Sequence, residues 1–399
     1  MAATLSAWND ALKRVYTSDS LVEQLYQENP FLDKIQKQTR YAPGETARVV
    51  IHTQRAGGFT VLPDGGGTLN TAGNQGIAKA EFDYTHQHMP IAIQGDVIDS
   101  ASSNAQTVAD VEEAHVSGAL NDLRKQLTRQ LFGNGDALIV VCRTSDSNDV
   151  DLNTTAGAQV LKRGWLHVGA QVDVGTTANE VSDVDGDTIT AVDRTNVAFT
   201  VAGGAETGDS TSDYVSIKNS RSGTTSYEAN GLRNIVSASV TLGGLTVAAQ
   251  DEWAAANVDT TSQALTISLI LQQEQEINQR GGNPDFILTS LKQKRKLYEQ
   301  LQQQVRFDGD KVAAGSNMPK WNGMELHSHP DCWDEDLYVG TFKHLFPIAT
   351  AKPAWQNSVT GGEILTWAQG TDSYVAKLTY RFNLATDRRN VFARLGGLT

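Results

Sequence analysis

The longest regular pattern of side chains in this chain runs from Thr107 to Phe132. Its mostly apolar face repeats at steps of three and four residues, at Val108, Val111, His115, Ala119, Leu120, Leu123, Leu127 and Leu131. This period predicts a single helix, which ends at the turn-forming run 133–135. At about 1.5 Å per residue the helix would be about 39 Å long, well above the average for globular proteins.

Two segments with the period-two alternation of β-strands precede this helix and flank a glycine-rich stretch. The first is Arg48–Thr53, and the second is Ala80–His86, continued through Ile93. The stretch between them, Gly57–Gly76, has little to bury, and glycine loses more backbone entropy on ordering than any other residue. Structureless loops of this length are uncommon inside compact domains unless they are functional. We therefore expect a long two-stranded ribbon with a loose tip, on a subunit that completes its contacts with its neighbours.

Residues 150–220 are rich in Thr, Val, Gly and Asp, and they contain short β-type runs separated by turn residues. The runs are Gly164–Val168, Gln171–Val174, Thr188–Val192, Ala198–Val201 and Asp213–Ile217. Five short strands in one segment predict a small all-β barrel. Because a helical pattern resumes after it, we expect this barrel to be inserted into the main fold.

Two further helices are predicted, at Thr266–Arg280 and at Leu291–Val305, the second starting with a capping box formed by Ser290 and Gln293. A short buried strand, Asp285–Leu288, separates them, and several β segments follow up to the last residues. Residues 1–45 contain two short amphipathic patterns broken at Pro30 and Pro43, so we interpret them as an arm. The fold class predicted from these elements is α+β.

The charge, the apolar runs and the cysteine count of the chain exclude several classes of protein. The chain has 399 residues and a formal net charge of −13, which makes the whole surface a poor electrostatic match for DNA or anionic membrane. No apolar run approaches the roughly 18–20 residues needed to span a bilayer, and the first residues lack the pattern of an export signal. The two cysteines, Cys142 and Cys332, exclude a disulfide scaffold and a four-cysteine zinc site.

Three segments resemble chemical sites. His327 and His329 precede a cysteine and four carboxylates, but the spacing matches no established zinc pattern, and a strand running into an acidic turn explains it as well. Asp183–Asp187 resembles the start of a calcium loop, but Arg194 occupies the position of the required acid, so a hairpin turn is favoured.

The third segment is the densest basic run, formed by Lys292, Lys294, Arg295 and Lys296. It could bind phosphate, although a solvated helix face with an Arg295–Glu299 pair is the simpler interpretation. The chain contains no phosphate-binding P-loop, dinucleotide motif or nucleophile elbow, so we expect neither enzymatic activity nor a cofactor.

The order of these elements resembles the major capsid protein of tailed bacteriophages, the HK97-like fold. The resemblance is carried by the ribbon (Arg48–Ile93), the long helix (Thr107–Phe132), residues 267–301 with their Gly-Gly-x-Pro-Asp turn, and the closing segment Asp387–Leu395. The resemblance covers nearly the whole chain. It depends on the order of the helices and strands, and no diagnostic motif supports it.

The resemblance implies a domain plan. Residues 1–45 would be the N-terminal arm, and 46–105 the E-loop that lies over an adjacent subunit. Residues 106–140, containing the spine helix, and 346–399 would form the peripheral domain, and 225–345 the axial domain. The barrel at 150–220 departs from the minimal fold. Only a short arm precedes the ribbon, so we expect no in-chain scaffolding segment.

The resemblance also implies a function and partners. The chain would self-assemble as hexamers and pentamers into the icosahedral shell of a phage, synthesised in the cytoplasm of a bacterial host. Portal protein, a separate scaffold or decoration protein, and packaged double-stranded DNA contacted non-specifically would be its partners, and no membrane would be involved. The expected inter-subunit contacts are Arg48, Phe59, Val61, Leu62, Leu69 and Lys79.

Some members of this family link a lysine to an asparagine of another subunit, and Lys79 is the only lysine of the ribbon, but no partner for it can be chosen. Two alternatives stay open. The chain could be another phage or bacterial shell or tail protein, or a metal-dependent enzyme that uses His327 and His329.

Overall fold

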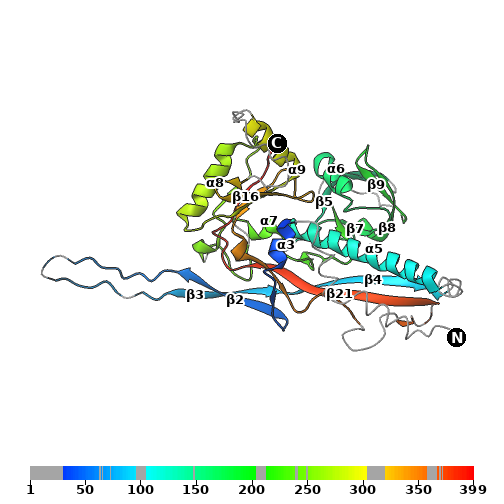
Figure 1. The fold of residues 1–399 in the computed structure, drawn as a ribbon, viewed down its shortest axis with the longest axis horizontal. Helices are drawn as coiled ribbons and strands as arrows, with labels where there is room; N and C mark the ends of the chain where they lie inside the picture. The colour runs from blue at the N-terminus through cyan, green and yellow to red at the C-terminus, as the bar shows by residue number, and fades with distance from the viewer. Residues whose placement is uncertain are drawn as a thin grey trace. The chain divides into compact units, whose positions relative to one another are not determined.

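The computed structural model describes residues 30–62, 64, 66–71, 73–95, 105–146, 149–203, 213–238, 241–248, 250–302, 320–356, 366–367, 370 and 372–399 (Figure 1). The chain forms two compact units, each assembled from separate stretches of sequence. Unit 1 takes the described residues of Met1–Gly44, Tyr84–Gly231 and Pro347–Leu384; unit 2 takes those of Glu45–Asp83, Leu232–Phe346 and Ala385–Thr399.

The predicted long helix is confirmed as α5 (Ala105–Leu131), which is 27 residues long. It lies along the strands β4 (Thr85–Gln94) and β21 (Ser373–Thr386), as Figure 1 shows. Leu120, Leu123 and Leu127 enter a core that the two strands complete with Ile91, Ile93, Leu378 and Tyr380. The spacing of apolar residues along α5 therefore buries one continuous stripe against the sheet.

The sheet under α5 is built around β21, which is 14 residues long. Its order is β1–β18–β21–β19, and β4 and β20 also pair with β21. The additional strands are β1 (Arg40–Tyr41), β18 (Leu345–Ala349), β19 (Ala354–Trp355) and β20 (Thr366–Trp367). The strand β1 runs parallel to β18, with Arg40 opposite Ile348.

The predicted ribbon is real but shorter than expected. Strands β2 (Thr46–Gln54) and β3 (Gly76–Asp83) pair antiparallel, with Thr46 opposite Asp83. The segment predicted as one strand up to Ile93 divides at Tyr84, after which β4 pairs with β21. The paired ribbon therefore ends at Asp83, ten residues before the predicted end at Ile93. Both strands have one buried face and the same period of two, so the alternation does not show where the partner strand changes.

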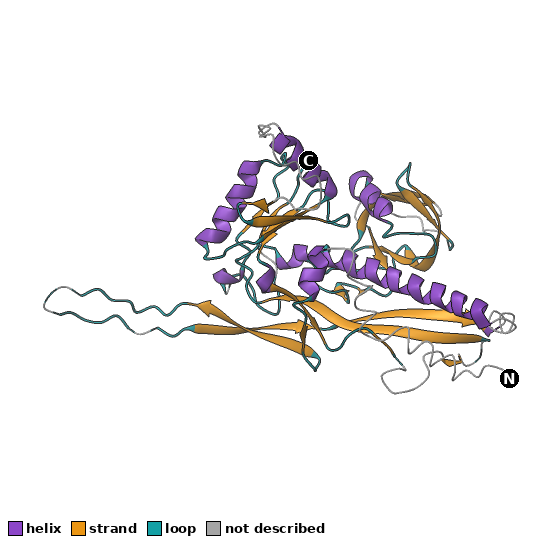
Figure 2. Ribbon diagram, viewed as in Figure 1, coloured by secondary structure: helices purple, strands orange, loops and turns teal. Residues whose placement is uncertain are grey.

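The barrel is also confirmed in outline and corrected in detail (Figure 2). Six strands close it in the order β10–β5–β6–β9–β8–β7. Their bounds are β5 (Val140–Asp146), β6 (Asp149–Leu152), β7 (Gln171–Gly175), β8 (Val184–Asp193), β9 (Ala198–Val201) and β10 (Tyr214–Ile217). The barrel thus begins at Val140, ten residues before the predicted start at 150.

One predicted barrel strand, Gly164–Val168, is wrong. The chain forms the helix α6 (Thr154–Arg163) just before it, and Gly164 ends that helix in the left-handed conformation with φ 73°. The side chain of Asn153 accepts hydrogen bonds from the backbone N–H groups of Thr155 and Ala156 at the other end. The helix has a strong N-cap and C-cap, and these local signals outweigh the β-type composition around it. The short strands β11 (Arg221–Ser222) and β12 (Thr225–Ser226) follow the barrel.

Unit 2 contains a second sheet with the order β13–β22–β17–β14–β16–β15. Its strands are β13 (Asn257–Asp259), β14 (Phe286–Thr289), β15 (Lys320–Trp321), β16 (Met324–Ser328), β17 (Leu337–Gly340) and β22 (Ala393–Leu395). The helices α8 (Ile267–Gln279) and α9 (Leu291–Gln302) share its core through Ile270, Ile277 and Leu297. Short helical turns complete the unit at α7 (Leu232–Ile235), η1 (Asp251–Trp253) and η2 (Phe342–His344).

The predicted strand Asp285–Leu288 and both predicted helices are confirmed within a few residues, although 303–305 lie outside the described residues. The Oγ1 of Thr266 accepts from the N–H of Leu269 at 3.4 Å, and the Oγ of Ser290 accepts from the N–H of Gln293 at 3.3 Å. The reciprocal half of the predicted capping box does not form, because Gln293 donates its side-chain N–H to the carbonyl of Asp334 at 2.8 Å.

Unit 2 buries a network of charges around Asp336, whose side chain is 0% exposed. One carboxylate oxygen accepts from Arg233 at 2.6 Å and from the hydroxyl of Tyr338 at 2.9 Å. The other accepts from Arg394 Nη2 at 3.1 Å. Burial and the Asp336 carboxylate both raise the pKa of Tyr338 well above its ordinary value. Full pairing of this kind is what allows a carboxylate to stay buried.

Candidate functional site

The base of the ribbon is fixed to its own unit by one buried face. Ala80 and Phe82 are almost completely buried, as is Ala47 on the opposite strand. The backbone N–H of Glu81 donates to the carbonyl of Gly243 at 2.9 Å. Gly243 has φ 61°, and a Cβ there would lie 2.9 Å from the Cβ of Ala80, so the close approach of the two segments depends on glycine.

Beyond the paired strands, the loop continues as two extended segments that face each other, as Figure 1 shows. The N–H of Gly73 donates to the carbonyl of Gly57 at 2.8 Å, and Asn70 Nδ2 donates to the carbonyl of Phe59 at 2.9 Å. A Cβ on Gly73 would lie 2.7 Å from the backbone of Gly57. The tip expected to be loose is therefore partly ordered across the ribbon, and glycine permits the two backbones to approach.

The outward side chains of this loop are strongly exposed and apolar. Phe59 is 87% exposed, Val61 79% and Leu69 71%, while Leu62 is exposed to a smaller degree, 40%. These four were predicted from the sequence as contacts to another subunit. Burial of apolar surface lowers the free energy by about 25 cal/mol per Å². A row of exposed apolar side chains is therefore a candidate binding surface.

The structure adds two apolar residues that sequence reasoning missed. Val50 is 65% exposed and Ile77 is 68% exposed. The alternation in β2 could have revealed Val50, because it shares a face with Arg48 and His52, which are exposed as well. We name the exposed apolar set of the ribbon the ribbon surface: Val50, Phe59, Val61, Leu62, Leu69 and Ile77.

The two charged residues predicted in the ribbon also lie on its exposed face. Arg48 Nε lies 2.8 Å from a carboxylate oxygen of Glu81, and both side chains are largely in water. Lys79 is exposed and stands opposite Val50 in the register. An exposed ion pair such as Arg48–Glu81 contributes little to the free energy of folding. Both Arg48 and Lys79 are therefore available for contacts outside their own unit.

The basic run on α9 is partly neutralised within its own unit. Lys294 Nζ donates to Ser328 Oγ at 3.2 Å, and Lys296 Nζ donates to the main-chain oxygen of Thr399. The predicted pair of Arg295 with Glu299 forms at 3.6 Å, and Lys292 is exposed. A phosphate-binding role for this helix stays a prediction.

The two histidines of the alternative enzyme hypothesis lie in different surroundings. His327 is buried on β16, with Nε2 3.5 Å from a carboxylate oxygen of Glu325, and its ring meets Phe342 edge to face. His329 Nδ1 accepts from the N–H of Asp331 at 3.0 Å. Within the described ranges, no group of three or more His, Cys, Asp and Glu side chains is placed to hold a metal ion.

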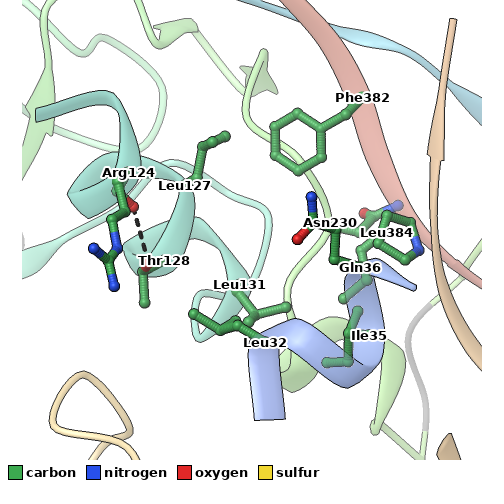
Figure 3. Close-up of a pocket in the computed structure, with 11 residues that line it drawn as sticks. Leu32, Ile35, Gln36, Arg124, Leu127, Thr128, Leu131, Asn230, Phe382 and Leu384 are labelled. Carbon is green, nitrogen blue, oxygen red and sulfur yellow. Dashed lines mark hydrogen bonds between the residues drawn. The ribbon is translucent and has the colours of Figure 1, made fainter. Parts of the chain in front are cut away.

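An apolar cavity of about 40 Å³ lies in unit 1, where the helix α3 (Pro30–Gln36) meets α5 and β21 (Figure 3). Ligand pockets measure several hundred Å³, so this cavity is a packing gap. Phe31, Leu32 and Ile35 on α3 are buried. This part of the predicted arm thus packs on its own unit, while the first predicted pattern, Leu21–Tyr26, lies outside the described residues.

Comparison with known proteins gives one family match to a segment of the chain and several similar folds. Residues 213–320 match the sequence model of the SU10 major capsid protein family. The structure is similar to a chain of the cyanophage A-1(L) capsid asymmetric unit, with a TM-score of 0.56, 13% identity and 93% of each chain covered. No curated protein matches the sequence significantly.

Two further solved structures are similar at lower scores. A chain of Mycobacterium phage Bobi has a TM-score of 0.44, 10% identity, and covers 92% of this chain and 89% of its own. A chain of the capsid of a native GTA particle has a TM-score of 0.47, 8% identity, and covers 92% and 90%.

None of the helices in the described residues has the length and apolarity needed to cross a membrane. The fold is an α+β capsid fold, and the matched family is one of structural, self-associating proteins found in virions. The matched segment and the shared fold together support a major capsid protein of tailed bacteriophages, a structural subunit of the capsid shell.

Proposed function

We propose that this chain is an HK97-like subunit whose ribbon, β2–β3 with the loop between them, acts as the E-loop that covers an adjacent subunit. The observation that carries the proposal is the exposure of Phe59, Val61 and Leu69 on an extended loop whose base is anchored by buried residues. The loop's hydrogen bonds run across the ribbon, so its outward side chains are free to bind a second copy.

The remaining parts fit the same plan. The helix α5 has the length expected of the spine, and with β4 and β21 it would form the peripheral domain. The sheet of unit 2 with α8 and α9 would form most of the axial domain at 225–345. The closed barrel, starting at Val140, would be an insertion between them. Residues 1–45 would contribute the N-terminal arm.

In this proposal the subunit assembles as hexamers and pentamers into an icosahedral shell that encloses double-stranded DNA. Portal protein and a separate scaffold or decoration protein are its further partners. Synthesis takes place in the cytoplasm of the bacterial host. The acidic net charge of −13 suits such a container, because a strongly basic wall would hold the packaged genome tightly.

The test is electron microscopy of the purified protein and of a variant lacking residues 58–72, which joins Gly57 directly to Gly73. We expect closed icosahedral particles from the unaltered chain. The variant keeps the paired strands and should give a folded, soluble subunit that forms none. Circular dichroism of both proteins checks that the fold is retained. Tubes or flat sheets from the unaltered chain would contradict the capsid assignment, and normal particles from the variant would contradict the role of the ribbon.

A further inference from the structure

The sheet of unit 1 has two faces of opposite character. Directly opposed residues on β4 and β21 share a face, so the register pairs Met89 with Leu378 and Ile91 with Ala376 on the side of α5. The other face pairs His86 with Arg381, His88 with Thr379 and Pro90 with Lys377. We name His86, His88, Lys377 and Arg381 the basic stripe.

The basic stripe is largely exposed, and the described residues place no acid beside its lysine or arginine. Both histidines and Arg381 are exposed and Lys377 is half-buried. In the described part of the chain, no carboxylate lies within ion-pair distance of Lys377 or Arg381. Burial, followed by repulsion from Lys377, His86 and Arg381, lowers the pKa of His88.

The geometry points to the phosphate backbone of double-stranded DNA as the ligand of the basic stripe. At about 3.4 Å per residue, Lys377 and Arg381 are about 14 Å apart along β21. Each strand of B-DNA carries one phosphate per 3.4 Å of helix axis, so the stripe spans about four phosphates. The inference rests on the proposed function in one respect, namely that a shell enclosing DNA brings the subunit into contact with phosphate.

A second protein surface fits the basic stripe less well. The core of a protein–protein interface is depleted of charge and enriched in aromatic residues. On this face Lys377 stands opposite Pro90 and His88 opposite Thr379, while the aromatic residues of β21, Tyr374, Tyr380 and Phe382, lie on the α5 side. Interfaces with DNA are polar and positively charged. Unlike Arg295 on α9, Lys377 and Arg381 have no ion-pair partner among the residues that the structure describes.

The test measures binding of a fluorescein-labelled 20-base-pair DNA of mixed sequence to the full chain by anisotropy over a range of salt concentrations. The variant Lys377→Gln with Arg381→Gln removes two charges from the stripe. Its matched control, Lys37→Gln with Lys162→Gln, removes two exposed charges that lie outside the basic stripe and outside α9, and it changes the net charge equally. Circular dichroism and melting curves check that both variants are folded.

We expect the slope of log K against log salt concentration to fall by about 1.8 in the stripe variant, since each lost phosphate contact removes about 0.9. The control should keep the slope of the unaltered chain. Equal losses in the two variants would show a net-charge effect and overturn the inference, as would the absence of DNA binding by the unaltered chain.

Electron microscopy of the same preparations separates the two proposals. Particles formed by the stripe variant, together with its reduced DNA binding, support a DNA surface. Lost particles with unchanged DNA binding would identify the stripe as a subunit contact and overturn the inference. If the unaltered chain forms no shells but binds DNA through the stripe, the capsid proposal fails and the inference stands.

Discussion

Replacing three apolar residues of the ribbon surface tests how much of the assembly energy this loop provides. The variant Phe59→Ser, Val61→Ser, Leu69→Ser removes side chains that are 87%, 79% and 71% exposed in the subunit. Complete burial of such a side chain contributes about 1.5–3 kcal/mol. Scaled by these exposed fractions, burial of the three on a neighbour contributes up to about 4–7 kcal/mol for each loop. Every 1.4 kcal/mol is a factor of ten, so the association constant for one contact should fall about 10³- to 10⁵-fold.

The folded subunit itself should be unaffected, because exposed side chains outside special backbone positions change stability by about 0.5 kcal/mol or less. Sedimentation velocity over a range of protein concentrations measures assembly, and thermal melting measures the fold. A matched control removes exposed apolar groups elsewhere, with Val168→Ser and Tyr227→Ser, residues that are 59% and 52% exposed. The reasoning is refuted if the ribbon variant assembles at the concentration of the unaltered chain, or if the control loses assembly equally.

Three further predictions concern the two units. Asp336→Asn should lower the free energy of unfolding by about 3–5 kcal/mol, because it breaks a buried, fully paired charge, whereas Glu299→Gln at an exposed pair should change it by under 1 kcal/mol in denaturant titrations. Lys377→Gln should raise the pKa of His88, because repulsion from Lys377 is one of the causes that lower it. NMR titration of the His88 imidazole measures this pKa, and an unchanged midpoint would contradict the interaction. Gly243→Ala should destabilise the chain by about 1–2 kcal/mol, since its φ of 61° disfavours a side chain, and an unchanged melting curve would contradict this.

The helical part of the fold could be predicted because its signals are local. The apolar period predicted α5 within two residues at each end, and the hydroxyl group of Ser290 marked the first turn of α9. The side chains of Phe59, Val61 and Leu69 are exposed, as expected for a stretch with too few apolar groups to form a core, and their contact with another subunit stays a prediction. In contrast, the helix α6 was missed because its caps are short signals inside a β-rich composition.

Strand pairing could not be read from the sequence. Alternation identified the residues of β3 and β4, but the change of partner at Tyr84 depends on β21, which lies almost 300 residues further along the chain. The same is true of β5 and β6, whose place in the barrel depends on closure with β9 and β10. Pairing across such separations is decided by the summed burial of a complete sheet.

The sequence by itself determined the element order, the long helix and the exposed loop, because each follows from the period or composition of one contiguous segment. The tertiary structure alone decided that α3 packs on its own unit and that Asp336 forms ion pairs with two arginines. It also decided that the two histidines of β4 share a sheet face with Lys377 and Arg381. These groups are brought together by strands and helices from distant parts of the chain. Their chemistry therefore exists only once the sheets have formed.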